Sequence, residues 1–312
     1  MPSEYNMEKR AKNKTIAVTS AVTIGANNLR TSQIECSNNN PSFIANYVEN
    51  KLQEFTFIVC GAPRTGKSTL VNAIIGRDVA PTGPGPAPIT LESTCYELNG
   101  TLPEITDRQT SEKYIDAQHF RINIWDTKGI TTWDSSIVDI VRQKNPMCVI
   151  LCASPGSFAN NEFIRELINE CINFNILIVL VCTNQWNGSD ESRQAVMKEF
   201  DNLLKSYNQE IKEENGIHYY GNVGLTSLVN SVEYINRRLE IEKPNKAIGS
   251  LLFGIMKSLN SDKLLGWCYT VMENDGFWSQ MQTEVQDFFA GKFMYGKSIL
   301  WSLSRGKTWF RN

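Results

Sequence analysis

The sequence predicts an α/β fold, a doubly wound and mainly parallel six-stranded sheet with a C-terminal helical extension. The first observation behind this prediction is that short apolar runs alternate with amphipathic segments between residues 55 and 242. The second is a glycine-rich loop that joins the first apolar run to the first amphipathic segment. The third is that helical stripes replace the strand pattern from residue 243 onwards. Strands that alternate with helices indicate a parallel sheet covered on both faces.

The expected strands are apolar and four to eight residues long, as buried strands are. They cover residues 55–60, 93–98, 120–125, 147–152, 176–182 and 218–223. The expected helices repeat their apolar residues with the 3.6-residue period. They cover residues 68–75, 135–143, 161–173 and 192–207. The second and third strands are expected to pair antiparallel around a turn at Asn99-Gly100, because no helix pattern lies between them.

The 312 residues divide into four segments. Residues 1–40 are polar and have no period, which is typical of a disordered arm. Residues 41–54 carry apolar side chains at helical spacing and predict a short leading helix. Residues 55–242 form the α/β domain described above. Residues 243–312 predict a helical segment that packs on the sheet or on a partner.

The composition excludes several classes of protein. The net charge of −2 gives no reason to expect nucleic acid as a partner. The longest apolar runs are far shorter than the roughly 20 residues of a membrane span, and the N-terminus has no apolar signal region. Several of the eight cysteines lie in apolar runs, as Cys60 and Cys182 do. Buried free thiols indicate a reducing compartment, so we expect a cytoplasmic protein.

The loop at residues 61–69 fits the phosphate-binding pattern G-x-x-x-x-G-K-[ST]. Its backbone N–H groups and the positive end of the following helix can hold a triphosphate. Lys67 would reach the outer phosphates, and the Ser68 hydroxyl would bind Mg²⁺. The nucleotide-binding residues expected here are Gly61, Arg64, Thr65, Gly66, Lys67, Ser68 and Thr69.

A second group for the metal follows the strand at 120–125. That strand ends in Asp126, whose carboxylate can hold Mg²⁺, and Gly129 can offer a backbone N–H to the γ-phosphate. Between the two motifs, residues 79–90 form a proline- and glycine-rich run that cannot be regular structure. Thr90 in this run could close over Mg²⁺ when a γ-phosphate is present, and Thr82 and Thr94 are alternatives.

Together these motifs resemble the P-loop GTPases, the large family of Ras, Era- and EngA-type proteins, septins and immune-associated nucleotide-binding GTPases. The run G-x-P-x-x-G-K-S-T-L-x-N-A-I-I-G at residues 61–76 is similar to the Era-type loop, and residues 88–92 resemble the immune-associated group. The resemblance covers about residues 55–240. It implies GTP and GDP as ligands, Mg²⁺, slow hydrolysis and a conformational switch. Its expected partners are an effector protein or a nucleotide-dependent dimer.

The base-recognition motif departs from the family pattern. The family reads guanine with N-K-x-D, and the corresponding residues here are Asn184, Gln185, Trp186 and Asn187. Asparagine offers one acceptor oxygen where aspartate offers two, so the change should cost about 1–3 kcal/mol if a buried donor stays unpaired. Trp186 could stack on the base in compensation. A P-loop ATPase with relaxed base specificity is therefore an alternative.

The residues expected to act in hydrolysis are Arg64, Lys67, Thr90 and Gly129. Ile130 stands where Ras-type enzymes have a glutamine that orients water, and an isoleucine cannot do so. A guanidinium at Arg64 could lie along the phosphates, as an arginine finger supplied in cis would. A solvent-facing arginine is the alternative, and so is a nucleotide-binding scaffold with negligible turnover.

Two further regions leave alternatives open. The fifth family motif, a short loop near the base, could be Thr226-Ser227 or Asn230-Ser231. The tail at 291–312 is basic and aromatic without acidic residues, so it could contact a membrane surface or pack on the domain. His119 and His218 lack metal-ligand spacing.

Overall fold

The computed structural model describes residues 52–83, 92–102, 105–106, 113–115, 118–130, 136–157, 161–184, 186, 189–238 and 240–292. The arm predicted at residues 1–40, most of the leading helix and the tail from residue 293 lie outside the described residues. The leading helix was predicted to extend to residue 54. That boundary is wrong, because Gln53 and Glu54 already belong to the first strand.

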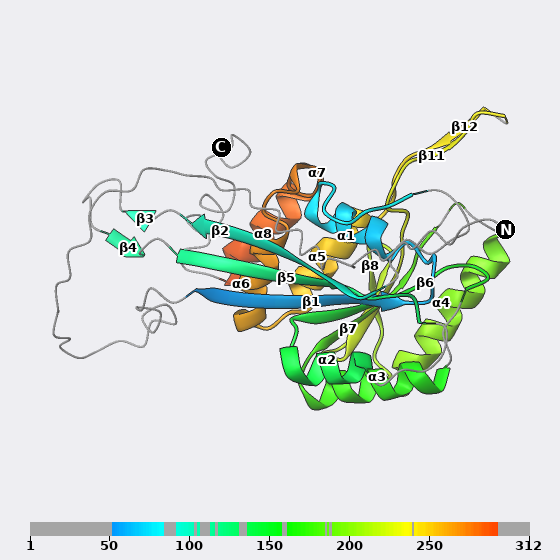
Figure 1. Ribbon diagram of the computed structural model, residues 1–312, viewed down its shortest axis with the longest axis horizontal. Coiled ribbons are helices and arrows are strands. Elements are labelled where there is room, and N and C mark those ends of the chain that lie inside the picture. Colours follow the sequence, from blue (N-terminus) through cyan, green and yellow to red (C-terminus); the bar gives the residue numbers. More distant parts are fainter. Residues whose placement is uncertain are drawn as a thin grey trace, which may run out of the picture.

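One sheet of eight strands forms the centre of the molecule, in the order β2-β5-β1-β6-β7-β10-β9-β8 (Figure 1). The strands from β5 to β10 are parallel, and β2, β9 and β8 run antiparallel to their neighbours. The α/β class and the antiparallel pair are confirmed, and the sheet is larger than predicted. The strands are β1 Gln53–Gly61, β2 Thr94–Leu102, β5 Gln118–Asp126, β6 Cys148–Ala153, β7 Leu177–Cys182, β8 Lys212–Glu214, β9 Ile217–Tyr220 and β10 Gly224–Leu228.

Two local predictions were wrong. The strand expected at 218–223 covers β9 and a turn, whereas the parallel neighbour of β7 is β10. The buried hydroxyl residues Thr226 and Ser227 interrupt the apolar pattern of β10 and hide it in the sequence. Asn99-Gly100 is no turn, since β2 continues through it to Leu102. A Cβ at Gly100 would come within 2.3 Å of the Phe120 ring, so the glycine allows that ring to lie against the strand.

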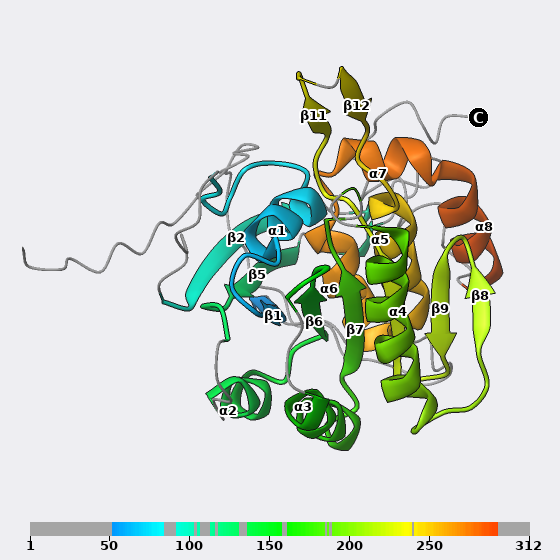
Figure 2. The same ribbon diagram turned by 90° about the vertical axis from the view of Figure 1, so that its right-hand side faces the viewer.

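The helices cover both faces of the sheet, as Figures 1 and 2 show. One hydrophobic core joins the sheet to α1 and α5–α8, and a second joins its other face to α2–α4. The C-terminal helical segment thus packs on the sheet. The helices are α1 Lys67–Ile75, α2 Ser136–Lys144, α3 Asn161–Asn173, α4 Asp190–Lys205, α5 Ile248–Ser258, α6 Ser261–Thr270, α7 Asp275–Gln280 and α8 Gln282–Lys292. None of the described helices is long and apolar enough to cross a membrane.

Asn274, the residue before α7, links the two ends of the domain. Its Nδ2 donates to the carbonyl oxygens of Ala73 at 2.8 Å and Ile74 at 2.9 Å, at the end of α1. Its Oδ1 accepts from the Phe277 N–H and caps α7. One amide side chain therefore supplies hydrogen-bond partners to two carbonyl oxygens in the last turn of α1 and to a backbone N–H in the first turn of α7.

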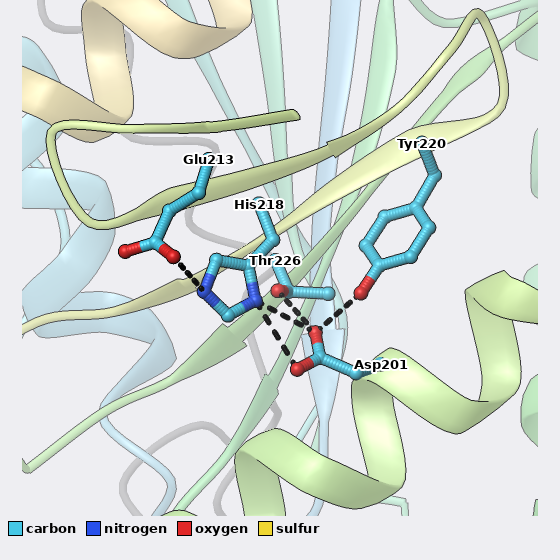
Figure 3. Close-up of polar contacts among 5 residues, drawn as sticks. All are labelled: Asp201, Glu213, His218, Tyr220 and Thr226. Atoms are coloured by element: carbon cyan, nitrogen blue, oxygen red, sulfur yellow. Dashed lines mark hydrogen bonds and ion pairs between the residues drawn. The ribbon is translucent and has the colours of Figure 1, made fainter. Parts of the chain in front are cut away.

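Asp201 on α4 is the centre of a polar cluster (Figure 3). Its Oδ1 accepts from the Tyr220 hydroxyl at 2.6 Å and the Thr226 hydroxyl at 2.9 Å. His218 Nδ1 lies 3.1 Å from both carboxylate oxygens, and its Nε2 lies 3.9 Å from Glu213. Burial and the bond to Asp201 raise the pKa of Tyr220. The cluster joins α4 to β9 and β10.

We expect Asp201→Ala to lower the free energy of unfolding by about 3 kcal/mol, because it removes the acceptor of two hydroxyl groups. Urea unfolding measures the change. Asn202→Ala, at the exposed neighbouring position on α4, is the matched control and should change little. A loss below about 1 kcal/mol would show that water or other groups replace the carboxylate.

Two small two-stranded sheets lie outside the central one. They are β3 Ile105–Thr106 with β4 Lys113–Ile115, and β11 Tyr234–Asn236 with β12 Ile241–Lys243. The β11–β12 hairpin projects away from the body of the molecule in both views (Figures 1 and 2). Its exposed apolar side chains are Val232, Tyr234, Ile235 and Ile241.

Candidate nucleotide-binding site

The phosphate loop lies at the carboxyl end of the central strand. β1 ends at Gly61 and α1 begins at Lys67, with Gly66 at φ 75° as the residue before the helix. The neighbours of β1 are β5 on one side and β6 on the other. In doubly wound sheets, ligands bind at such a point, where the connections diverge. The loop therefore presents the N-terminal end of α1 at the place where this fold binds ligands.

The loop is held by its own hydrogen bonds. The Thr65 hydroxyl donates to the Ala62 carbonyl oxygen, and Lys67 Nζ donates to the same oxygen, each at 2.9 Å. Burial lowers the pKa of Lys67, while Cys152 and Asp126 act in the opposite direction. The ammonium group is thus folded onto the loop, where a phosphate could replace the carbonyl as its partner.

Ser68 and Asp126, the two residues predicted to hold Mg²⁺, are in contact. The Ser68 hydroxyl donates to Asp126 Oδ2 at 2.6 Å. Asp126 is fully buried, and its Oδ1 has no hydrogen-bond partner among the described atoms. Burial raises the pKa of Asp126, although the bond from Ser68 lowers it. A hydroxyl and a carboxylate with an unused oxygen fit the oxygen ligands that Mg²⁺ prefers.

The segment from Asp126 to Ile130 runs beside the phosphate loop. The Thr127 N–H donates to the Val59 carbonyl, and the Ile130 N–H donates to the Gly61 carbonyl at 3.1 Å. A Cβ at Gly129 would come within 2.5 Å of Pro63, so this position requires glycine on steric grounds. Ile130 packs its side chain against the core under α2–α4.

Thr183 and Asn184 bring the base-side loop to the phosphate loop. The Thr183 hydroxyl donates to the Thr65 carbonyl oxygen at 2.6 Å, and its Oγ1 also lies 2.9 Å from the Ala153 carbonyl oxygen. Asn184 has a φ of 55°, and a Cβ on Gly66 would lie 3.8 Å from its Oδ1. The predicted base residues Gln185 and Asn187 lie outside the described residues.

The comparisons identify the class of domain. The family model described as the dynamin family, Dynamin_N, matches residues 57–209. That region contains both Lys67 and Asp126. The chain belongs to the P-loop GTPase superfamily. A search of curated proteins finds no match.

Solved structures with a similar fold include the bacterial selenocysteine-specific elongation factor EF-Sec, at 16% identity over 67% of this chain and 30% of that chain, with a TM-score of 0.39. Era from Aquifex aeolicus bound to GDP.AlF4- is 16% identical over 67% of this chain and 58% of that chain, with a TM-score of 0.39. A septin GTPase domain from Chlamydomonas reinhardtii is 16% identical over 62% of this chain and 82% of that chain, with a TM-score of 0.38. This chain therefore spans less than two thirds of EF-Sec and of Era. TM-scores below 0.5 add nothing to the assignment from the family model.

The remaining predicted site residues of this GTPase differ in position. Arg64 is exposed and has a φ of 63°. Thr69 is half-buried in the first turn of α1. Thr90 lies outside the described residues, and Thr94 is the first residue of β2.

The structure favours one of the two alternatives for the fifth motif. Thr226 and Ser227 are fully buried inside β10. Asn230 follows the end of that strand, and its backbone N–H and C=O pair with those of Lys246. Val229, the preceding residue, donates to the Cys182 carbonyl beside the base-side loop. Asn230-Ser231 thus has the position of a base-side loop.

Sequence reasoning missed the contacts that position the base-side loop of this GTPase. Trp186 Nε1 donates to the Pro244 carbonyl at 3.0 Å. The ammonium groups of Lys243 and Lys246 lie 4.6 and 5.4 Å from the Trp186 ring centre. The indole is therefore engaged by the root of the β11–β12 hairpin, at its Nε1 and at its ring. Stacking of Trp186 on a base stays a prediction. The single sequence contains no signal for this contact, because 58 positions separate Trp186 and Pro244.

A pocket of about 370 Å³ lies at the opposite edge of the sheet. It is lined by residues at the start of β1 and the ends of α2 and α3, among them Thr56, Lys144 and Asn175. Large pockets are the default binding-site hypothesis in an uncharacterised protein. Here the phosphate loop, Ser68 and Asp126 argue more strongly for the other edge, because their chemistry is specific for a nucleotide and its metal.

We expect Gly61→Ala to cost about 3 kcal/mol or more of unfolding free energy. Gly61 has a φ of 136°, and a Cβ there would lie 2.1 Å from the Cys152 carbonyl oxygen, which belongs to the sheet backbone and cannot move aside. Gly156→Ala is the control, because Gly156 has a φ of 82° and open space around it. That change should cost only the backbone strain, about 1–2 kcal/mol. Equal losses in urea unfolding would contradict the steric argument.

Proposed function

We propose that this GTPase is a Mg²⁺-dependent guanine-nucleotide switch that hydrolyses GTP slowly. The observation that carries the proposal is the 2.6 Å bond between Ser68 and Asp126, in which Asp126 keeps a buried oxygen without a partner. A buried carboxylate that retains an unused oxygen is costly unless a ligand uses it. The Lys67 ammonium beside it supplies the positive charge that a triphosphate needs.

The chain's own groups would rearrange little on binding. Lys67 would transfer its hydrogen bond from the Ala62 carbonyl to a phosphate oxygen. Ser68 and Asp126 would turn their oxygens from each other and hold Mg²⁺. The ion would supply positive charge beside the phosphates. The backbone N–H groups at the start of α1 would bind the phosphate oxygens between them.

Slow turnover follows from what residues 129–130 provide. The Ile130 side chain packs against the core and has no polar atom to orient a water molecule. Arg64 is the nearest exposed cation in the loop sequence and could offset charge in the transition state. Single-turnover hydrolysis by Arg64→Ala tests this role. A tenfold or greater loss at unchanged GTP affinity is expected, and an unchanged rate would leave Arg64 without a catalytic part.

Guanine preference depends on the residues of the base-side loop. Asn184 lies beside the phosphate loop, and Asn187 replaces the aspartate of the family motif. Competition binding of GTP, ATP and XTP with Mg²⁺ or with EDTA tests it. We expect GTP to bind most tightly of the three nucleotides, and about tenfold or more tightly with Mg²⁺ than with EDTA. Equal affinity for ATP and GTP would favour the ATPase, and binding without phosphate release would favour the scaffold.

Location and partners extend the same proposal. We place the protein in the cytoplasm, and the free thiols of Cys60, Cys148, Cys152 and Cys182 support a reducing compartment. Burial raises the pKa of Cys60 to about 12, so this thiol is unreactive. An effector protein or a nucleotide-dependent dimer would read the switch. Membrane contact through the tail at 291–312 stays a prediction, testable by sedimentation with vesicles.

A further inference from the structure

The β11–β12 hairpin is built like a strand pair that lacks a neighbour. It projects from the body (Figures 1 and 2), and a two-stranded ribbon is marginally stable in water on its own. Val232 and Ile235 are each 55% exposed. Within the described part of the chain, β12 is the sole strand that pairs with β11. An outer strand edge with exposed apolar side chains is a template for pairing with another strand.

The charges along β11 are separated by sign. Glu233 lies at the root of the hairpin, next to Glu242 on the facing strand. The hydrogen bond with Glu242 and its negative charge raise the pKa of Glu233. Glu233 directly precedes β11 at the root, and Arg237 directly follows it on the side of the tip. When a partner strand extends β11 by one residue at each end, both side chains share the face of Ile235, because strand side chains alternate. Ile235 lies between them.

The other charges of the hairpin do not cancel this separation. Arg238 adds a second cation at the tip, and Glu240 is the acidic residue there. At the root, Lys243 pairs with Tyr234, so its side chain lies on the other face of the hairpin from Ile235 and Glu242. Its ammonium group lies against the Trp186 ring. Lys246 directs its ammonium to the same ring. On the face that carries Ile235, the charges are therefore negative at Glu233 and Glu242 and positive at Arg237.

We propose that β11 pairs antiparallel with β11 of a second copy of this chain, about a two-fold axis through Ile235. In such a pair, residues at equal distances from the axis lie opposite each other. Glu233 then faces Arg237 of the second copy, and this contact occurs twice. Ile235 meets its own counterpart and loses its exposure. Pairing through β12 would instead place Glu242 opposite Glu242, which repels.

Self-association is measured by analytical ultracentrifugation across micromolar concentrations, without nucleotide and with GDP or a GTP analogue. Arg237→Glu and Glu233→Arg should each weaken it about tenfold or more, because two symmetry-related contacts become repulsive. A chain with both substitutions should regain it, because each opposite-charge pair returns with its signs exchanged. Lys198→Glu makes the same change in charge on the exposed face of α4 and should leave association intact.

Three results would overturn the proposal: a wild-type chain that stays monomeric in every nucleotide state, association that Arg237→Glu does not change, or a double variant that fails to associate. Binding of vesicles or of another protein through Ile235 without self-association would assign the hairpin to that partner instead. Nucleotide affinity measured on the same variants should stay unchanged. The inference is thus independent of the proposed function: the pairing can be refuted while the nucleotide-binding function stands.

Discussion

Lys67→Met is expected to lower the affinity for GTP at least about 100-fold, or about 2.8 kcal/mol. The substitution keeps most of the apolar stem and removes the ammonium that would bind the outer phosphates. The folded chain should not be destabilised, because burial lowers the pKa of Lys67 and its charged form is therefore disfavoured in the fold. Titration with a fluorescent GTP analogue measures the affinity.

Lys205→Met on the exposed last turn of α4 is the matched control, and it should bind GTP like the wild type. Thermal unfolding of both variants without nucleotide separates lost binding from lost structure. If Lys67→Met binds GTP within threefold of the wild type, the loop at 61–69 is no phosphate site in this chain.

Asp126→Asn should abolish the dependence of nucleotide binding on Mg²⁺. The amide keeps the size of the carboxylate and an acceptor for Ser68, but it removes the charge that Mg²⁺ requires. We expect affinity with Mg²⁺ to fall about tenfold or more, towards the value measured in EDTA. Asp139→Asn on the exposed face of α2 is the control. A variant that keeps the full Mg²⁺ effect would exclude Asp126 from the metal site.

Stability without nucleotide should change in the opposite sense. The pKa of Asp126 is raised in the fold, mainly by burial, so the folded chain holds a proton at a pH where the unfolded chain has lost it. The carboxylate therefore destabilises the ligand-free fold increasingly as pH rises through the raised pKa. Thermal unfolding of Asp126→Asn at neutral pH should occur no lower than that of the wild type, with a flatter dependence on pH.

The parts of this molecule that depend on local pattern could be predicted from the sequence. The phosphate loop is specified by nine consecutive residues, and the buried strands β1, β6 and β7 by unbroken apolar runs. The edge strand β8 was missed because its sequence, Lys-Glu-Glu, is charged throughout, and its first two residues are exposed. The position of β10 was predicted wrongly because it contains the polar residue Thr226. That residue can be buried because its hydroxyl donates to Asp201, 25 positions away in the chain.

The candidate site follows the same rule. Ser68 and Asp126 could be paired in advance because each belongs to a motif with a known place on its strand. The bond from Thr183 to Thr65 spans 118 positions, and no pattern in either segment announces it. The steric need for glycine at 129 depends on Pro63, which only the folded chain brings near. Contacts between distant segments therefore mark the limit of what this single sequence reveals.

The amide of Asn274 has a consequence for how the protein is made. The helix that bears the phosphate loop is finished by a residue 200 positions later in the chain, so α1 cannot acquire its last partners until the ribosome has passed that residue. Long-range contacts of this kind slow folding and leave nascent chains exposed. The nucleotide site is therefore expected to mature late in translation. A nascent chain halted before α5 should bind chaperones, because the sheet face that α5–α8 cover is still bare.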